Sequence, residues 1–255
     1  MNRQLQHFLD LIVVVTQKDL RVRYKNSFLG YFWSLANPLA YALVYYFAFK
    51  LVIRIKIEAY PLFLITALFA WQWFTNSVTL STTVFLRNAS LIKKVNFPRN
   101  IIVFAQVLQD MVHFIIAIPV IVLFKFLFHS PLQWSWLYGI PLLLVVQYCF
   151  AYGLAVLFAS LNLFFRDLER MVSVLVTLCF YLTPIIYSEH LIPAPYRPYI
   201  VLNPLAPLML NWRNVLLYGH LDLGYLALAA VYAVVLLLVG QLVYRKLSWK
   251  FAEIL

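Results

Sequence analysis

The sequence has few charged residues. Asp, Glu, Lys and Arg make up 11% of its 255 residues, whereas an ordinary soluble domain has about 25%. The hydrophobic fraction is 64%, and the mean hydropathy is +0.85. So few charges cannot cover the surface of a soluble domain of this length. The sequence therefore predicts an integral membrane protein.

Cysteine and glycine are also scarce. The two cysteines, Cys149 and Cys179, lie inside apolar segments, where a thiol packs like a small hydrophobic group. Among the six glycines no GxxxxGK[ST] loop occurs, so the chain has no phosphate-binding loop of that kind. Any ATP energy must then arrive through a partner, and we assign this chain no cofactor, no catalytic residue and no metal-binding residue.

Long apolar segments fill most of the chain. A bilayer core of about 30 Å takes about 20 apolar residues per helix, and six segments fit this length. The sequence predicts an all-α fold in which a basic amphipathic interface helix over 1–26 precedes the spans. The predicted spans are 28–52, 61–86, 101–128, 136–163, 171–187 and 222–244.

The segment 188–220 is apolar but interrupted by five prolines. Irregular backbone at membrane depth must be shielded by protein. We therefore expect two short re-entrant gate helices on the external side, between the fifth and sixth spans.

Most of the 20 lysine and arginine residues fall into the first segment, 87–100, the turn after 163 and the C-terminal tail. Basic residues gather on the cytoplasmic side of membrane proteins. This bias places both termini in the cytoplasm, and two termini on the same side require an even number of spans. The same bias explains the net charge of +11, so no binding to nucleic acid is needed to explain it. No nucleic-acid-binding motif is visible in the sequence.

The stretch NLFFRDLERM carries four balanced charges between the fourth and fifth predicted spans. On one helical turn Arg166 faces Glu169, and Asp167 faces Arg170, each at i, i+3. Balanced pairs favour a rigid cytoplasmic turn packed against protein. A solvated helix end is the alternative.

Polar residues also interrupt the third predicted span, at Gln106, Gln109, Asp110 and His113. Asp110 and His113 are spaced for a pair of the kind that a proton-driven carrier uses. Hydrogen bonds between packed helices are the alternative, and we favour it because Asp110 lies near the cytoplasmic end of this span.

Four stretches, at matching topological places, resemble one known family: RYKNSFLGYFWSLANPL, VNFPRNIIV, NLFFRDLERM and FYLTPIIYS. They are similar to the membrane subunits of ABC transporters that export lipid-linked polysaccharides, such as O-antigen and teichoic acid. The resemblance implies a homodimer in the cytoplasmic (inner) membrane, paired with two P-loop nucleotide-binding subunits. ATP and Mg would then bind to those subunits, and the substrate would be a lipid-linked glycan.

Aromatic and polar-tipped residues recur on the first predicted span at i+4 spacing, which places them on one face. Aromatic rings bind the C–H faces of sugars without directional bonds that would trap a moving polymer. Aromatic anchoring at the membrane interface is the alternative. The predicted channel-lining residues are Trp33, Asn37, Tyr41, Tyr45, Phe180, Tyr181 and Tyr187, and Trp71 and Trp73 are further candidates.

The remaining candidate sites lie in two basic segments, 21–30 and 87–100. Residues 87–100 form the longest internal connection, and in the resembling family this connection carries a helix that docks into the ATPase. A basic membrane anchor is the alternative for both segments. The predicted ATPase-coupling residues are Ser90, Leu91, Ile92, Lys93 and Lys94, and the predicted head-group entry residues are Arg21, Arg23, Lys25, Leu29 and Gly30.

Two other functions remain open at the level of sequence. A membrane glycosyltransferase or acyltransferase needs an acidic or histidine-based site near an interface, and Glu189-His190 is the one candidate. A proton-coupled carrier would show inverted repeats or more buried charge, and neither is visible.

Overall fold

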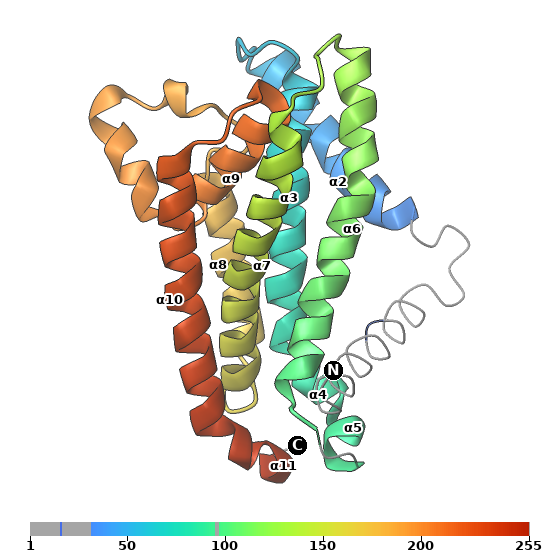
Figure 1. Cartoon of the computed structure of the whole chain (residues 1–255), viewed down its shortest axis with the longest axis vertical. Coiled ribbons are helices and arrows are strands. Elements are labelled where there is room, and N and C mark those ends of the chain that lie inside the picture. The colour runs from blue at the N-terminus through green and yellow to red at the C-terminus, as the bar shows by residue number, and fades with distance from the viewer. Residues whose placement is uncertain (1–15, 17–31, 95–96, 255) are drawn as a thin grey trace.

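The computed structural model describes residue 16 and residues 32–94 and 97–254 (Figure 1). Within these ranges all regular structure is helical, which confirms the all-α prediction for this part of the chain. The predicted interface helix and the head-group entry residues lie outside the described ranges. The side chains of Trp33 and Asn37 are likewise not described.

The predicted spans correspond to helices with similar bounds. The elements are α2 (Phe32–Tyr45) with its π-helical continuation η1 (Tyr46–Val52), α3 (Tyr60–Thr82), α4 (Val84–Arg87), α5 (Ala89–Lys94), α6 (Asn100–Leu127), α7 (Ser135–Asn162), α8 (Leu168–Leu182), η2 (Glu189–Leu191), η3 (Ala194–Leu202), α9 (Ala206–Arg213), η4 (Asn214–Tyr218), α10 (Leu223–Leu247), η5 (Ser248–Lys250) and α11 (Phe251–Ile254).

Three of these helical segments are long and apolar enough to cross a membrane: α6, α7, and α10 together with η5. Helix α3 has 23 residues, but its second half is more polar, with Gln72, Asn76 and Ser77. Helix α8 has only 15 residues. The count of six spans therefore stays a prediction.

Helix α8 ends at Leu182, five residues before the predicted end of the fifth span at Tyr187. Thr183 is extended, with φ −96° and ψ 135°, because the ring of a following proline disfavours helical backbone. For this reason the helix ends before the predicted end of the span at 187.

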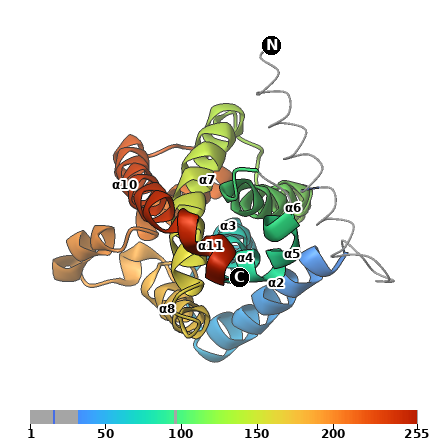
Figure 2. The same ribbon diagram turned by 90° about the horizontal axis from the view of Figure 1, so that it is seen from below.

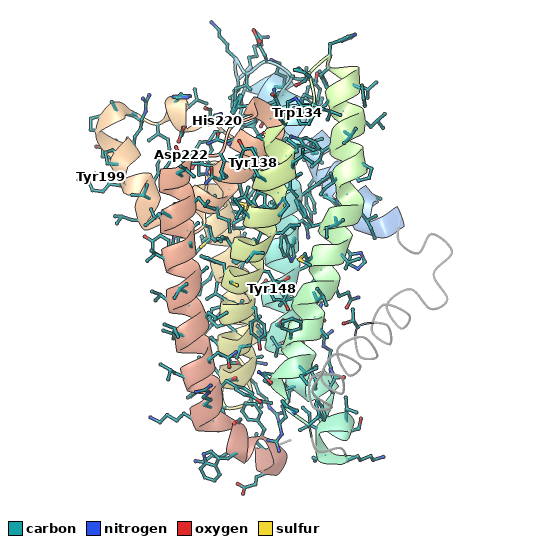
Figure 3. The ribbon with its side chains drawn as sticks, in the orientation of Figure 1. Trp134, Tyr138, Tyr148, Tyr199, His220 and Asp222 are labelled. Atoms are coloured by element: carbon teal, nitrogen blue, oxygen red, sulfur yellow. The ribbon has the colours of Figure 1, made fainter. Side chains whose placement is uncertain are left out.

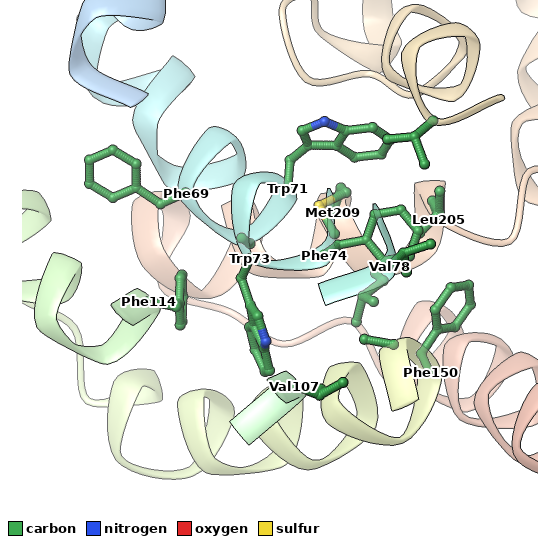
Figure 4. Packing of buried hydrophobic residues seen from close by; sticks show 14 of the residues in the cluster. Phe69, Trp71, Trp73, Phe74, Val78, Val107, Phe114, Phe150, Leu205 and Met209 are labelled. Carbon is green, nitrogen blue, oxygen red and sulfur yellow. The ribbon is translucent and has the colours of Figure 1, made fainter. Parts of the chain in front are cut away.

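Helix α3 forms the centre of the bundle, surrounded by α2, α6, α7 and α8 (Figure 2). Most of its side chains are buried, and its large rings point in several directions (Figure 4). Trp73 stacks on Phe114 at 5.4 Å between ring centroids, and Phe114 in turn meets Trp212 of α9 at 4.8 Å. The core is therefore organised around one helix rather than around a single helix pair.

Helices α7 and α10 pack closely because two glycines face each other at their crossing. A Cβ atom on Gly153 would lie 2.6 Å from the backbone of Leu236 and Leu237, and one on Gly240 would collide with the carbonyl oxygen of Gly153. Small residues allow this approach of helix backbones inside a membrane.

The segment between α8 and α10 is broken into short pieces, as its prolines predict. Its first part, with η2 and η3, projects beside α10 (Figure 1), whereas α9 and η4 return to the bundle, where most of their residues are buried. Whether these pieces are re-entrant in a membrane stays a prediction.

Candidate functional site

A cavity of about 280 Å³ lies between α2, α3 and α8. Four of the predicted channel-lining residues meet in it, although they come from two helices far apart in the sequence. Tyr41 and Tyr181 are about half exposed, so the cavity opens on the flank of the chain. Its lining residues are Tyr41, Tyr45, Leu68, Trp71, Gln72, Thr75, Val176, Thr177, Phe180 and Tyr181.

The rings around this cavity form a continuous aromatic wall. Phe180 stacks on Tyr45 at 5.5 Å and also lies 5.6 Å from Trp71, and Tyr45 stacks on Tyr41 at 6.4 Å. The spacing of i+4 on α2 aligns the two tyrosines, while α8 brings Phe180 against them. Together with the polar Gln72, Thr75 and Thr177 on the other faces, this wall can hold the apolar faces and some hydroxyls of sugars.

Two other aromatic candidates lie elsewhere. Tyr187 is not among the lining residues of the cavity, and its hydroxyl donates to the backbone carbonyl of Tyr181 at 3.2 Å. Trp73 stacks on Phe114, away from the cavity. Trp71 and Trp73 are two positions apart on α3, so they point to opposite sides of this helix, and only the fold decides which of the two rings faces the cavity.

Arg213 is a central residue that the sequence analysis missed. Its buried guanidinium donates hydrogen bonds to the carbonyls of Pro184 and Ile185, both at 2.6 Å, and to that of Phe63 at 3.4 Å. It also lies 3.7 Å from the centroid of the Phe63 ring, within cation–π range. Arg213 thereby joins α9, the start of α3 and the chain just after α8.

Other side chains support the same junction. The hydroxyl of Tyr60 donates to the carbonyl of Ile186 at 2.8 Å, and Asn203 donates to the hydroxyl of Thr183 at 2.9 Å. The stretch TPII, residues 183–186, therefore accepts hydrogen bonds from three side chains: Arg213, Tyr60 and Asn203. Its position fixes the end of α8, the helix that carries Phe180 and Tyr181 into the cavity.

The two residues before Arg213 attach α9 to further helices. The indole of Trp212 donates to the side-chain oxygen of Gln147 on α7, whose amide nitrogen donates to the carbonyl of Ala70 at 2.8 Å. Asn211 and the backbone of Asp222 exchange two hydrogen bonds of 2.9 Å. Asp222, labelled in Figure 3, directly precedes the first residue of α10. The available sequence signal was the run Asn-Trp-Arg inside an apolar segment, since polar groups there need partners.

The predicted coupling segment is amphipathic. On α5, Ile92 is buried and Leu91 is half-buried, whereas Ser90, Lys93 and Lys94 are exposed. Helices α4 and α5 lie at the end of the bundle where α11 also lies (Figure 1). The exposed lysines therefore form a surface that a partner protein can reach at this end.

The turn NLFFRDLERM is held differently from the predicted pairing. Arg166, Asp167, Glu169 and Arg170 are all exposed, and within the described residues no ion pair joins them. Instead the buried Asn162 accepts a hydrogen bond from the backbone N–H of Glu169 at 3.1 Å, in the first turn of α8. A buried amide holds this turn, because a side-chain oxygen satisfies a backbone donor that a helix start leaves free.

Asp110 takes part in helix packing. Its carboxylate accepts hydrogen bonds from Gln106 at 3.0 Å and from Ser77 of α3 at 3.4 Å. The bond from Gln106 lies within α6, whereas the bond from Ser77 links α6 to the central helix α3, as the packing interpretation predicts.

Comparisons with known proteins identify the family of this chain. The family described as ABC-2 type transporter matches residues 10–217. An O-antigen export system permease protein from Klebsiella pneumoniae is 47% identical over 255 residues, which cover all of this chain and 98% of the relative. A protein of the same name from Myxococcus xanthus is 30% identical, with 98% of this chain and 97% of that protein aligned.

A more distant relative is a polysialic acid transport protein from Escherichia coli, which is 21% identical over 89% of this chain and 90% of its own length. The family match covers most of the sequence, and the relative from Klebsiella pneumoniae aligns with all of it. The chain therefore belongs to the ABC-2 type transporter family of membrane proteins.

Proposed function

We propose that this chain is the channel-forming permease half of an ATP-driven exporter of lipid-linked polysaccharide, of the O-antigen type. Full-length similarity to O-antigen export permeases supports the substrate class. The observation that carries the proposal is the cavity between α2, α3 and α8, which has an aromatic wall and opens on the flank of the chain.

We propose further that two copies face each other across this flank. Each chain then contributes half of an aromatic channel through the cytoplasmic (inner) membrane. Exposed apolar side chains on α2, η1 and α8, such as Leu43, Phe47, Leu175 and Leu178, support this pairing, because they are not covered within one chain. In this arrangement six spans place both termini in the cytoplasm, and Arg21, Arg23, Lys25, Leu29 and Gly30 receive the lipid head group.

In the same proposal, two P-loop subunits bind ATP and Mg and dock on α5. The six-residue helix offers Ser90, Lys93 and Lys94 to solvent. The alternative of a membrane transferase has little support, because Glu189 accepts a hydrogen bond from Tyr225 at 3.1 Å and His190 is exposed. A proton-coupled carrier has little support either, because Asp110 is engaged in helix packing.

Replacing both Tyr41 and Tyr45 with alanine is expected to reduce export several-fold, because two stacked rings leave the cavity wall. Surface glycan is measured in cells that contain equal amounts of permease in the membrane. Phe126→Ala provides the control, because Phe126 is an exposed ring on α6 outside the cavity. Normal export by the double variant would contradict the channel assignment, and so would an equal loss in the control.

Reversing charge at Lys93 and Lys94, with glutamate at both positions, is expected to weaken binding of the ATPase subunit or to uncouple ATP hydrolysis from export. The exposed lysines face the partner in the proposal, so two repulsive contacts replace two attractive ones. Co-purification of the two subunits and the amount of glycan exported per ATP hydrolysed are the measurements. Reversal of Arg54 and Lys56, two exposed residues between η1 and α3, is the control. Wild-type assembly and coupling in the Lys93/Lys94 variant would show that α5 is not the docking helix.

A further inference from the structure

The C-terminal segment 241–251, named here the C-terminal latch, packs against the chain on both sides of α5. On the first side, the fully buried Phe251 of α11 lies 5.0 Å from the ring of Phe85 on α4 and 5.9 Å from the ring of Tyr244. Phe85 is itself fully buried and stacks on Tyr244 at 6.5 Å. Three rings therefore fix the chain just before α5.

On the second side, the latch binds the residues at the start of α6. The guanidinium of Arg99 donates to the carbonyl of Ser248 at 2.5 Å, and the backbone N–H of Asn100 donates to the hydroxyl of Tyr244 at 3.2 Å. The side chains of Asn100 and Gln241 both donate to the hydroxyl of Tyr152 on α7, each at 3.3 Å. The chain between α5 and α6 is thus tied to α7, α10 and η5 at Arg99 and Asn100.

Helix α5 itself contributes little to its own placement. It has six residues, and Ile92 is its one fully buried side chain among those described. Isolated helices shorter than about 12 residues are marginal in water, so the direction of α5 depends on what holds its two ends. One segment, 241–251, contacts the chain near both of these ends.

We propose that the C-terminal latch orients the coupling helix α5, with Phe251 as the main positioning residue. The proposal rests on the proposed function, in which α5 transmits ATP-driven motion from the partner subunit. A rigidly seated α5 moves the bundle when the partner moves. A loosely seated α5 still binds the partner but transmits less of its motion.

The first test measures the seating of α5 without reference to transport. Ile92→Cys is introduced into a chain whose Cys149 and Cys179 have been replaced by alanine, and maleimide labelling is followed over time in membranes. Phe251→Ala is expected to accelerate labelling about tenfold, because local opening exposes the buried position. Trp249→Ala is the matched control, since it removes an exposed ring from the same tail. Unchanged labelling in Phe251→Ala, or equal acceleration in the control, would overturn the latch.

The second test measures coupling in the complex with its ATPase. Phe251→Ala is expected to keep subunit assembly and ATP hydrolysis while the glycan exported per ATP falls several-fold. Phe251→Leu is expected to recover part of the loss, because leucine refills most of the buried space. If the alanine variant does not accumulate in membranes, Phe251→Leu is compared with the wild type instead, by the same measurement of glycan exported per ATP. Normal coupling in Phe251→Ala, or in Phe251→Leu where only that variant accumulates, would overturn the proposal.

The outcomes separate this inference from the proposed function. If charge reversal at Lys93 and Lys94 disturbs coupling but Phe251→Ala affects neither labelling nor coupling, α5 is the docking helix and the latch is wrong. If Phe251→Ala accelerates labelling while the lysine reversal leaves assembly and coupling intact, the latch holds the segment, but the segment does not couple. In that case the proposed role of α5 fails, and with it the functional half of this inference.

Discussion

Replacing Arg213 with alanine is expected to abolish export, the largest effect that we expect from a single polar side chain. Three carbonyl oxygens, of Phe63, Pro184 and Ile185, lose their donor. A buried acceptor left without a partner costs about 1–3 kcal/mol. The free energy of unfolding should therefore fall several times further than after an ordinary substitution at the surface. The end of α8 is then free to shift, and Phe180 moves with it.

The measurements are the amount of permease in membranes, its thermal unfolding in detergent and the surface glycan. Arg213→Lys is expected to recover only part of the stability, because a single ammonium lacks the planar fork that reaches several carbonyls. Arg197→Ala is the matched control. Arg197 also donates to two backbone carbonyls, of His190 and Ile192, but it is exposed. Wild-type stability and export in Arg213→Ala would show that this buried junction is not needed.

Replacing Gly153 with leucine is expected to prevent folding. Even a Cβ atom at this position would lie 2.6 Å from the backbone of α10, and backbone cannot rotate away as a flexible side chain can. Extra volume in a packed interior typically costs about 1–3 kcal/mol and occasionally more. The cost at Gly153 should lie at the upper end of this range, because α7 and α10 must move apart where they cross.

The yield of monodisperse protein after extraction from membranes measures this effect. Gly224→Ala is the control on α10, where an added Cβ would meet only the side chain of Asp222, at 3.2 Å. We expect the control to accumulate like the wild type, because alanine favours a helix over glycine by about 1 kcal/mol. Normal yield of Gly153→Leu would mean that the two helices do not cross as closely as the glycine contacts indicate.

Some features could be predicted from the sequence because they are local. Composition alone predicted a helical membrane protein, since too few charges are available for a soluble surface. The i+4 spacing of Tyr41 and Tyr45 predicted a shared face, and both rings line one cavity. The apolar Ile92 and the charged Lys93 and Lys94 are adjacent in the segment 87–100, and Ile92 is buried while both lysines are exposed. In each case the signal lies within one helical segment, whose period decides which side chains share a face.

The tertiary structure alone decided which distant segments meet. Phe180 joins Tyr45 only because α8 packs beside α2, and no pattern within either helix specifies that contact. Asn162, rather than the predicted charge pairs, holds the turn before α8, because a buried amide satisfies backbone groups that exposed charges do not reach.

Arg213 gives the clearest case of this division. The sequence by itself determined that an arginine stands in an apolar, proline-rich segment, where its charge needs partners. Only the fold decided that those partners are backbone carbonyls, one of them 150 positions away at Phe63. Carbonyl groups are present at every residue, so they leave no sequence signal, and their availability depends on where helices end. The end of α8 before Pro184 exposes such carbonyls, and the packing of α9 brings the guanidinium to them.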